Sequence, residues 1–97
     1  MDLEEAYWAA KQLYEDLQRA ADKDAEQEIR GPAIDTVDAV LDACRRFLPD
    51  HPIVGRLQNV LSPEAIATGD PVRVVDVVPG VGQIATALEL KRPPLIA

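Results

Sequence analysis

The first 29 residues contain neither glycine nor proline, and this feature restricts the fold of the chain more than any other. Residues 2–29 are rich in Ala, Glu, Leu, Gln, Lys and Arg, which are good helix formers. Apolar residues recur in steps of three and four and define one stripe: Leu3, Tyr7, Ala10, Tyr14, Leu17 and Ala21. The pattern therefore predicts one long helix over residues 2–29, whose last two turns, beyond Ala21, project from the core or fray.

A second helix follows directly. Gly31 suits the end of a helix and Pro32 suits the first position of the next one. The apolar face of this second helix, over residues 32–48, is Ile34, Val37, Leu41, Cys44 and Leu48. Because the connection between the two amphipathic helices is short, we expect an antiparallel helical hairpin.

Two shorter helical segments are indicated next. Asp50 is a candidate N-cap for a helix over residues 51–61. Ser62 followed by Pro63 has the pattern of another helix start, which opens a short turn that stops near Gly69.

The stretch 72–78 carries two conflicting signals. Five of its seven residues are valine, which favours a strand. Arg73 and Asp76 would point to opposite faces of a strand, whereas three residues apart on a helix they share one face and can pair. We therefore predict a helix over residues 71–91, kinked or broken near Pro79-Gly80. The alternative is a β-hairpin at 72–90, which would make the protein α+β.

Together these segments predict an all-α fold, a small helical bundle built on the N-terminal hairpin. The length of 97 residues suits a single domain over 1–97. Residues 92–97 are expected to form an extended tail, because Pro93-Pro94 disfavours a helix.

Composition argues against several function classes. With 10 Lys and Arg against 17 Asp and Glu, the net charge is −7, so we do not expect direct nucleic-acid binding. One Cys and one His cannot complete a Cys/His zinc site, and Gly80-Val81-Gly82 alone is no dinucleotide fingerprint. We predict no catalytic, cofactor or metal site. Without a signal-peptide pattern or a long apolar run, we expect a soluble, cytoplasmic protein that does not enter the membrane.

Two residues could still carry chemistry. Cys44 lies on the apolar face of its helix, so we expect it to be a buried core residue rather than a nucleophile. His51 next to Asp50 could act as a general base, which would fit a small enzyme or accessory subunit. The sequence favours a non-enzymatic protein over this alternative.

Trp8 is the most informative residue. Helical spacing places it away from the apolar stripe, on a polar face with Glu4, Gln12, Glu15 and Arg19. Because Trp is enriched at interfaces, these five residues predict a surface through which the first helix binds a protein partner or a second copy. Alternatively, Leu95 and Ile96 of the tail cover Trp8. A different function is an acidic decoy for a basic nucleic-acid-binding partner, using Glu4, Glu15, Asp22 and Glu26.

Overall fold

The computed structural model describes residues 2–69 and 72–92, and the described part of the chain contains five helices and no strand. They are α1 (Leu3–Lys23), α2 (Gly31–Arg45), α3 (Pro52–Val60), α4 (Pro63–Thr68) and α5 (Val74–Lys91). The predicted all-α fold is confirmed. The β-hairpin alternative at 72–90 is wrong, because nearly all of this stretch is α5. Of the predicted tail, residues 93–97 lie outside the described residues.

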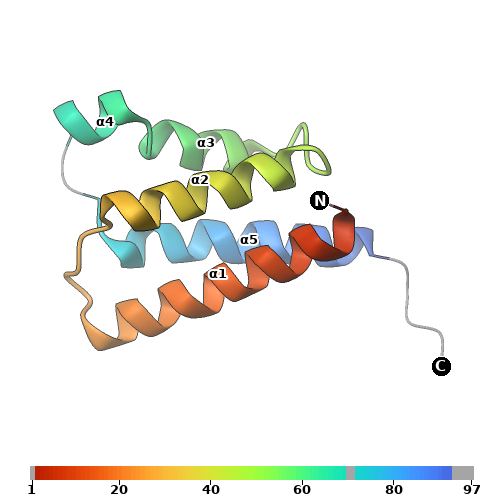
Figure 1. The fold of residues 1–97 in the computed structure, drawn as a ribbon, viewed down its shortest axis with the longest axis horizontal. Coiled ribbons are helices and arrows are strands. Elements are labelled where there is room, and N and C mark those ends of the chain that lie inside the picture. Colours follow the sequence, from red (N-terminus) through yellow and green to blue (C-terminus); the bar gives the residue numbers. More distant parts are fainter. Residues whose placement is uncertain (1, 70–71, 93–97) are drawn as a thin grey trace.

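Four of the helices form an antiparallel bundle (Figure 1). Around the bundle, α1 packs against α2, α2 against α3, α3 against α5, and α5 against α1. Neighbouring helices run in opposite directions, so the predicted hairpin of α1 and α2 is present. The most extensive contact of α1 is nevertheless with α5, its neighbour from the other end of the chain. The short α4 extends from the end of α3 (Figure 1).

The first helix is shorter than its sequence indicates. Asp2 caps its start, where the carboxylate accepts the backbone N–H of Glu5 at 2.8 Å. The helix predicted over 2–29 is too long, because α1 ends at Lys23, and residues 24–29 of the two turns that were expected to project or fray are not helical. The apolar stripe stops at Ala21, so residues beyond it gain no buried contact by staying helical. The chain instead turns, and Asp24 accepts the backbone N–H of Glu26 at 3.0 Å.

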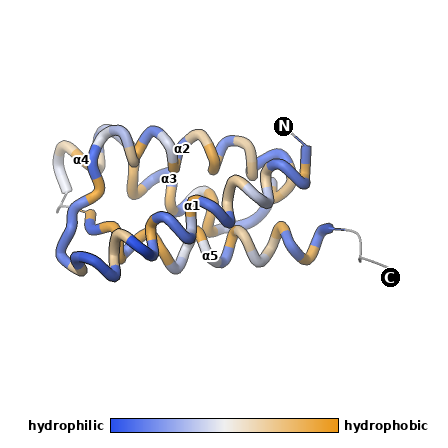
Figure 2. Tube along the Cα trace, turned by 60° about the horizontal axis from the view of Figure 1, so that its bottom comes forward, coloured by the Kyte–Doolittle hydropathy of each residue, from blue (hydrophilic) through white to orange (hydrophobic). Residues whose placement is uncertain are grey.

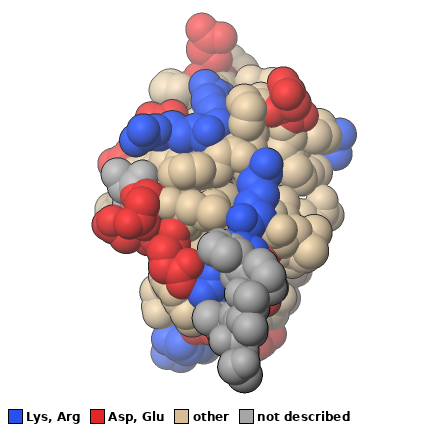
Figure 3. Space-filling model, turned by 90° about the vertical axis from the view of Figure 1, so that its right-hand side faces the viewer, with Lys and Arg blue, Asp and Glu red and all other residues tan. Residues whose placement is uncertain are grey.

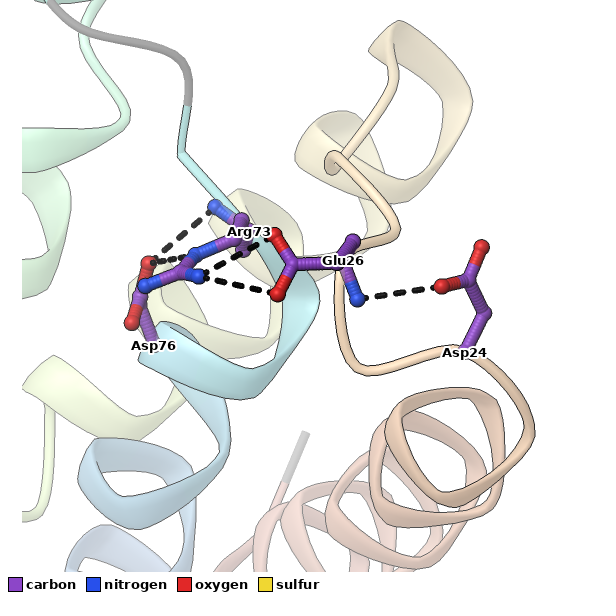
Figure 4. Close-up of polar contacts among 4 residues, drawn as sticks. All are labelled: Asp24, Glu26, Arg73 and Asp76. Carbon is purple, nitrogen blue, oxygen red and sulfur yellow. Dashed lines mark hydrogen bonds and ion pairs between the residues drawn. The ribbon is translucent and has the colours of Figure 1, made fainter.

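Residues 26–29 are held against the start of α5 (Figure 4). The backbone N–H of Ile29 donates to Val72 at 2.9 Å, and that of Val74 donates to Gln27 at 2.8 Å. Beside this pairing, the Arg73 guanidinium lies 3.3 Å from the Glu26 carboxylate and 3.4 Å from that of Asp76. The predicted pairing of Arg73 with Asp76 is therefore present. Arg73 also joins the α1–α2 connection to α5.

The middle of the chain follows the sequence closely, with one correction. The predicted cap by Asp50 is wrong, because His51 occupies the N-cap position of α3 and Pro52 is its first residue. Asp50 is exposed, and it lies one residue before the N-cap position, from which a side chain would reach the free N–H groups of the helix. The cap predicted at Ser62 is confirmed, since its hydroxyl accepts the backbone N–H of Ala65 at 3.2 Å.

The last helix runs without a break through Pro79, so of the predicted kink or break near Pro79-Gly80 the break is wrong. Pro79 is exposed, and it removes only one hydrogen bond from the ladder. The two glycines of α5 allow close helix packing. A Cβ on Gly80 would lie 2.9 Å from Cδ1 of Leu57, and a Cβ on Gly82 would lie 2.9 Å from Cε2 of Tyr14. Glycine at these positions lets α3 and α1 approach α5 from its two sides.

The buried side chains form one hydrophobic cluster to which all four bundle helices contribute. At its centre lie Leu41 of α2 together with Ile84 and Leu88 of α5, each at most 1 % exposed. Cys44 is fully buried in the same cluster, as predicted. In Figure 2 the far end of α1 is hydrophilic, whereas α5 carries hydrophobic residues along its length.

Candidate functional site

Trp8 lies on the side of α1 that points away from the core. The buried residues of α1 are Ala6, Tyr7, Ala10, Leu13, Leu17 and Ala21, and they cluster on the opposite side of the helix. The Trp8 side chain is 51 % exposed, which is unusual for the largest apolar side chain of a small protein. The indole therefore stands at the surface, where the helical spacing placed it.

Neighbouring side chains fix the indole in place. Its Nε1–H donates to a carboxylate oxygen of Glu4 at 3.2 Å. The Trp8 and Tyr7 rings pack edge to face, with their centroids 5.0 Å apart and their planes at 72°. The Lys11 ammonium lies 5.1 Å from the Trp8 centroid. The indole is thus solvent-exposed on one side and held by a polar and a cationic neighbour on the other.

Arg92 reaches this surface from the end of α5. Its guanidinium carbon lies 4.3 Å from the Tyr7 centroid and 5.6 Å from that of Trp8. It also forms two hydrogen bonds to Glu4, one of them from Nε at 2.9 Å. Hydrogen bonding between the two side chains lowers the pKa of the Glu4 carboxyl and raises the pKa of the Arg92 guanidinium. We call Glu4, Tyr7, Trp8, Lys11 and Arg92 the Trp8 surface.

The other predicted interface residues lie further along the same side of α1. Gln12 donates to Asp16 at 3.0 Å, and the Arg19 guanidinium lies 3.5 Å from the same carboxylate. Glu15 is exposed beside them. The structure therefore brings Glu4 and Trp8 into contact, and it links Gln12 to Arg19 through Asp16, which the sequence reasoning had not included.

Sequence reasoning missed three members of the Trp8 surface. Tyr7 had been assigned to the apolar stripe, and its ring is indeed buried, yet it also supports Trp8 and Arg92. Lys11 follows Tyr7 by four residues and Trp8 by three, a spacing that could have indicated contact with both rings. Arg92 carries no such local signal, because it lies 88 residues from Glu4 in the sequence.

A groove runs along the outer side of α5, next to the Trp8 surface. Its volume is about 680 Å³, and it is open to solvent. Tyr7, Lys11 and Tyr14 of α1 form one wall, and His51 contributes from the start of α3. The floor consists of α5 residues, among them Gly82 and Thr86. We call this feature the α5 groove.

His51 and Cys44, the two residues that could carry chemistry, differ in their surroundings. His51 borders both the α5 groove and a second cavity of about 460 Å³, and its Nδ1 has no hydrogen-bond partner among the described residues. No described carboxylate is hydrogen-bonded to this Nδ1. Burial raises the pKa of the Cys44 thiol to about 11, whereas a nucleophilic cysteine needs a lowered one.

The charged side chains form no continuous basic patch on the end of the molecule where α1 begins and α5 ends (Figure 3). Lys and Arg there lie in separate groups, with acidic and uncharged surface between them. Within residues 2–69 and 72–92, no three His, Cys, Asp or Glu side chains are grouped so that they could hold a metal ion. Over the same residues, no helix has both the length and the apolar character needed to cross a membrane.

The Trp8 surface and the α5 groove share Tyr7 and Lys11, so an exposed indole, two cations and an open groove lie side by side. No protein-family model, curated protein or solved structure matches this chain.

Proposed function

We propose that this chain is a non-enzymatic protein–protein interaction module that binds a protein partner through the Trp8 surface. The observation that carries the proposal is the half-exposed indole on the side of α1 opposite the core. Tryptophan and arginine are the residues most enriched among those that dominate binding energies. In this protein the two occur side by side, Trp8 on α1 and Arg92 at the end of α5.

The polar contacts of Trp8 suit it to be covered by a partner. A partner that buries an indole also removes its N–H from water, which is costly if the N–H loses its hydrogen bond. Here Glu4 accepts that N–H within the chain itself. The apolar ring can therefore be desolvated while the hydrogen bond remains.

The side chains of the Trp8 surface also contact one another within the chain itself. Tyr7 is buried and its ring contacts the indole, while Arg92 is fixed by two hydrogen bonds to Glu4. Side chains that are already restrained lose less conformational entropy on binding, which leaves more of the contact energy as affinity. We place this function in the cytoplasm, with which the free thiol of Cys44 is compatible.

The acidic-decoy alternative has less support. Of the four carboxylates proposed for it, Glu4 pairs with Arg92 and Glu26 pairs with Arg73. A basic partner would have to compete with these arginines. The two proposals differ in salt dependence, since binding dominated by charge weakens steeply as ionic strength rises.

The test compares three immobilised proteins exposed to an extract of the source cells: wild type, Trp8→Ala and Val60→Ala. Val60 is the matched control, because it is an exposed apolar residue on α3 with 40 % exposure. We expect a partner that binds wild type and Val60→Ala alike and binds Trp8→Ala about 10- to 30-fold more weakly, as for a central interface residue.

Circular dichroism confirms that the variants are folded. Equal retention of every bound protein by Trp8→Ala and wild type would contradict the proposal. A partner whose binding disappears in moderately raised salt, and does not depend on Trp8, would support the decoy instead.

A further inference from the structure

The last residue that the structure describes, Arg92, belongs to the Trp8 surface. As the C-cap of α5 its backbone has already left the helix, with φ −72° and ψ 143°, the extended conformation that a residue before proline adopts. Its side chain lies over the Tyr7 ring and is hydrogen-bonded to Glu4. Residues 93–97 therefore continue the chain from a point beside the exposed indole.

The chemistry of residues 93–97 suits contact with an indole. Their sequence is Pro-Pro-Leu-Ile-Ala, which contains no charged or polar side chain. Large aliphatic side chains gain free energy when they leave water for an apolar surface. Trp8 offers such a surface, because its side chain is 51 % exposed in spite of its contacts with Tyr7 and Lys11.

The length of the segment matches the distance to Trp8. An arginine side chain reaches about as far as two residues of extended chain, and the Arg92 guanidinium carbon lies 5.6 Å from the Trp8 centroid, so the indole lies within about 13 Å of the Arg92 backbone. Two consecutive prolines favour a polyproline helix, which rises about 3.1 Å per residue. Such a spacer carries Leu95 about 9 Å and Ile96 about 12 Å from Arg92, which is the range needed to cover the indole.

We propose that Leu95 and Ile96 fold back onto the exposed side of the Trp8 indole and cover it until a partner displaces them. This inference rests on the function proposed for the Trp8 surface and adds its regulation, because the segment and the partner compete for the same indole. The two prolines favour the arrangement, since a restricted spacer has less conformational freedom to lose when the segment docks.

The expected cover is weak enough to be displaced. Two aliphatic side chains on one indole bind with a dissociation constant on the order of 1 mM, and a short linker supplies an effective concentration of the same order. The segment is therefore expected to cover the indole in about half of the molecules. A partner that needs the uncovered indole then binds about twofold more weakly than it would without the segment.

Quenching of fluorescence by acrylamide measures the cover directly, because Trp8 is the only tryptophan of the chain. The diagnostic variant is Leu95→Ser/Ile96→Ser. The matched control is Val60→Ser/Ile66→Ser, since these two aliphatic residues are 40 % and 39 % exposed on α3 and α4. In the diagnostic variant we expect the quenching constant to rise by about 1.5- to 2-fold and the emission to shift to longer wavelength, while the control matches wild type. Equal quenching of the diagnostic variant and wild type overturns the proposal.

A second measurement shows whether the segment lies on Trp8 or in the α5 groove. A nitroxide is attached at residue 97 through Ala97→Cys in a Cys44→Ala background, which leaves a single thiol. We expect the nitroxide to broaden the indole N–H signal of Trp8 more strongly than the side-chain amide signal of Gln83, which lines the groove. Serine at positions 95 and 96 should reduce that broadening. The reverse order of the two signals would place the segment in the groove and overturn the proposal.

Neither measurement contains a partner, so the cover of Trp8 can be refuted while the proposed function stands, with a Trp8 surface that is always open. Once a partner is captured, Leu95→Ser/Ile96→Ser is expected to bind it about twofold more tightly than wild type. Unchanged or weaker binding of the partner by this variant would contradict the competition for the indole.

Discussion

Arg92 at the end of α5 donates a hydrogen bond of 2.9 Å to the carboxylate of Glu4 in the first turn of α1. The same guanidinium lies over the Tyr7 ring, so one side chain joins two helix ends and supports the Trp8 surface. Because Glu4 also accepts the indole N–H of Trp8, the ionisation of this carboxyl is linked to the surroundings of the fluorophore.

Acid should therefore change the fluorescence of Trp8. Arg92 lowers the pKa of Glu4 below its ordinary value of 4.5, which means that folding favours the ionised carboxylate. The stabilisation by this pair is complete above pH 4.5 and is lost as the pH falls through the lowered pKa. We expect a shift in Trp8 emission with a midpoint below pH 4.5. Glu4→Gln is the control and should lack this step, so an identical acid transition in that variant would contradict the assignment.

Replacing Arg73 should release the connection between α1 and α2. Arg73 contacts Glu26 from that connection and Asp76 from its own helix, beside the backbone pairs of Ile29 with Val72 and of Val74 with Gln27. In Arg73→Ala, hydrogen exchange is expected to speed up at the amides of Ile29 and Val74, while the middle of α1 stays protected. Arg19→Ala removes an exposed ion pair within α1 and should leave both amides unchanged. Unaltered protection in Arg73→Ala would show that the backbone pairing alone holds the segment.

The sequence predicted those features that depend on periodicity within one helix. The apolar stripe from Leu3 to Ala21 identified the buried side of α1, and the offset of Trp8 from that stripe placed the indole at the surface. Cys44 was likewise assigned to the core from the spacing of its neighbours. In each case the repeat of 3.6 residues determines which side chains share a face.

Features that depend on distant residues could not be predicted in this way. The path of residues 26–29 after α1 depends on their pairing with Val72 and Val74, which lie more than 40 residues further along the sequence. Arg92 joins the Trp8 surface only because α5 lies antiparallel to α1. The uninterrupted course of α5 through Pro79 is likewise not given by the local pattern.

Two glycine-to-alanine substitutions should have different outcomes. Gly55 lies inside α3, and a Cβ there would meet no atom within 4 Å. Gly55→Ala is therefore expected to raise the free energy of unfolding by about 0.5–1 kcal/mol, because alanine loses less backbone entropy in a helix. Gly82→Ala should gain less or lose stability, since its Cβ would lie 2.9 Å from the Tyr14 ring. Urea denaturation measures both values, and equal stabilisation by the two substitutions would show that α1 does not pack against Gly82 as described.

The buried thiol of Cys44 gives a test of the core under alkaline conditions. Burial raises the pKa of this thiol from 9.0 to about 11, so folding favours the protonated form. The contribution of Cys44 to stability is full below pH 9 and is lost as the pH rises through about 11, because the unfolded chain ionises first. We expect the unfolding free energy of wild type to fall over this range by more than that of Cys44→Ala, in which this group is absent.

At pH 8 a thiol reagent such as DTNB should modify the native protein only as fast as the core opens, and should modify the unfolded chain at once. Rapid labelling of the folded protein would mean that the packing of α2 around Cys44 admits solvent, and the thiol would then have to be considered again as a reactive group.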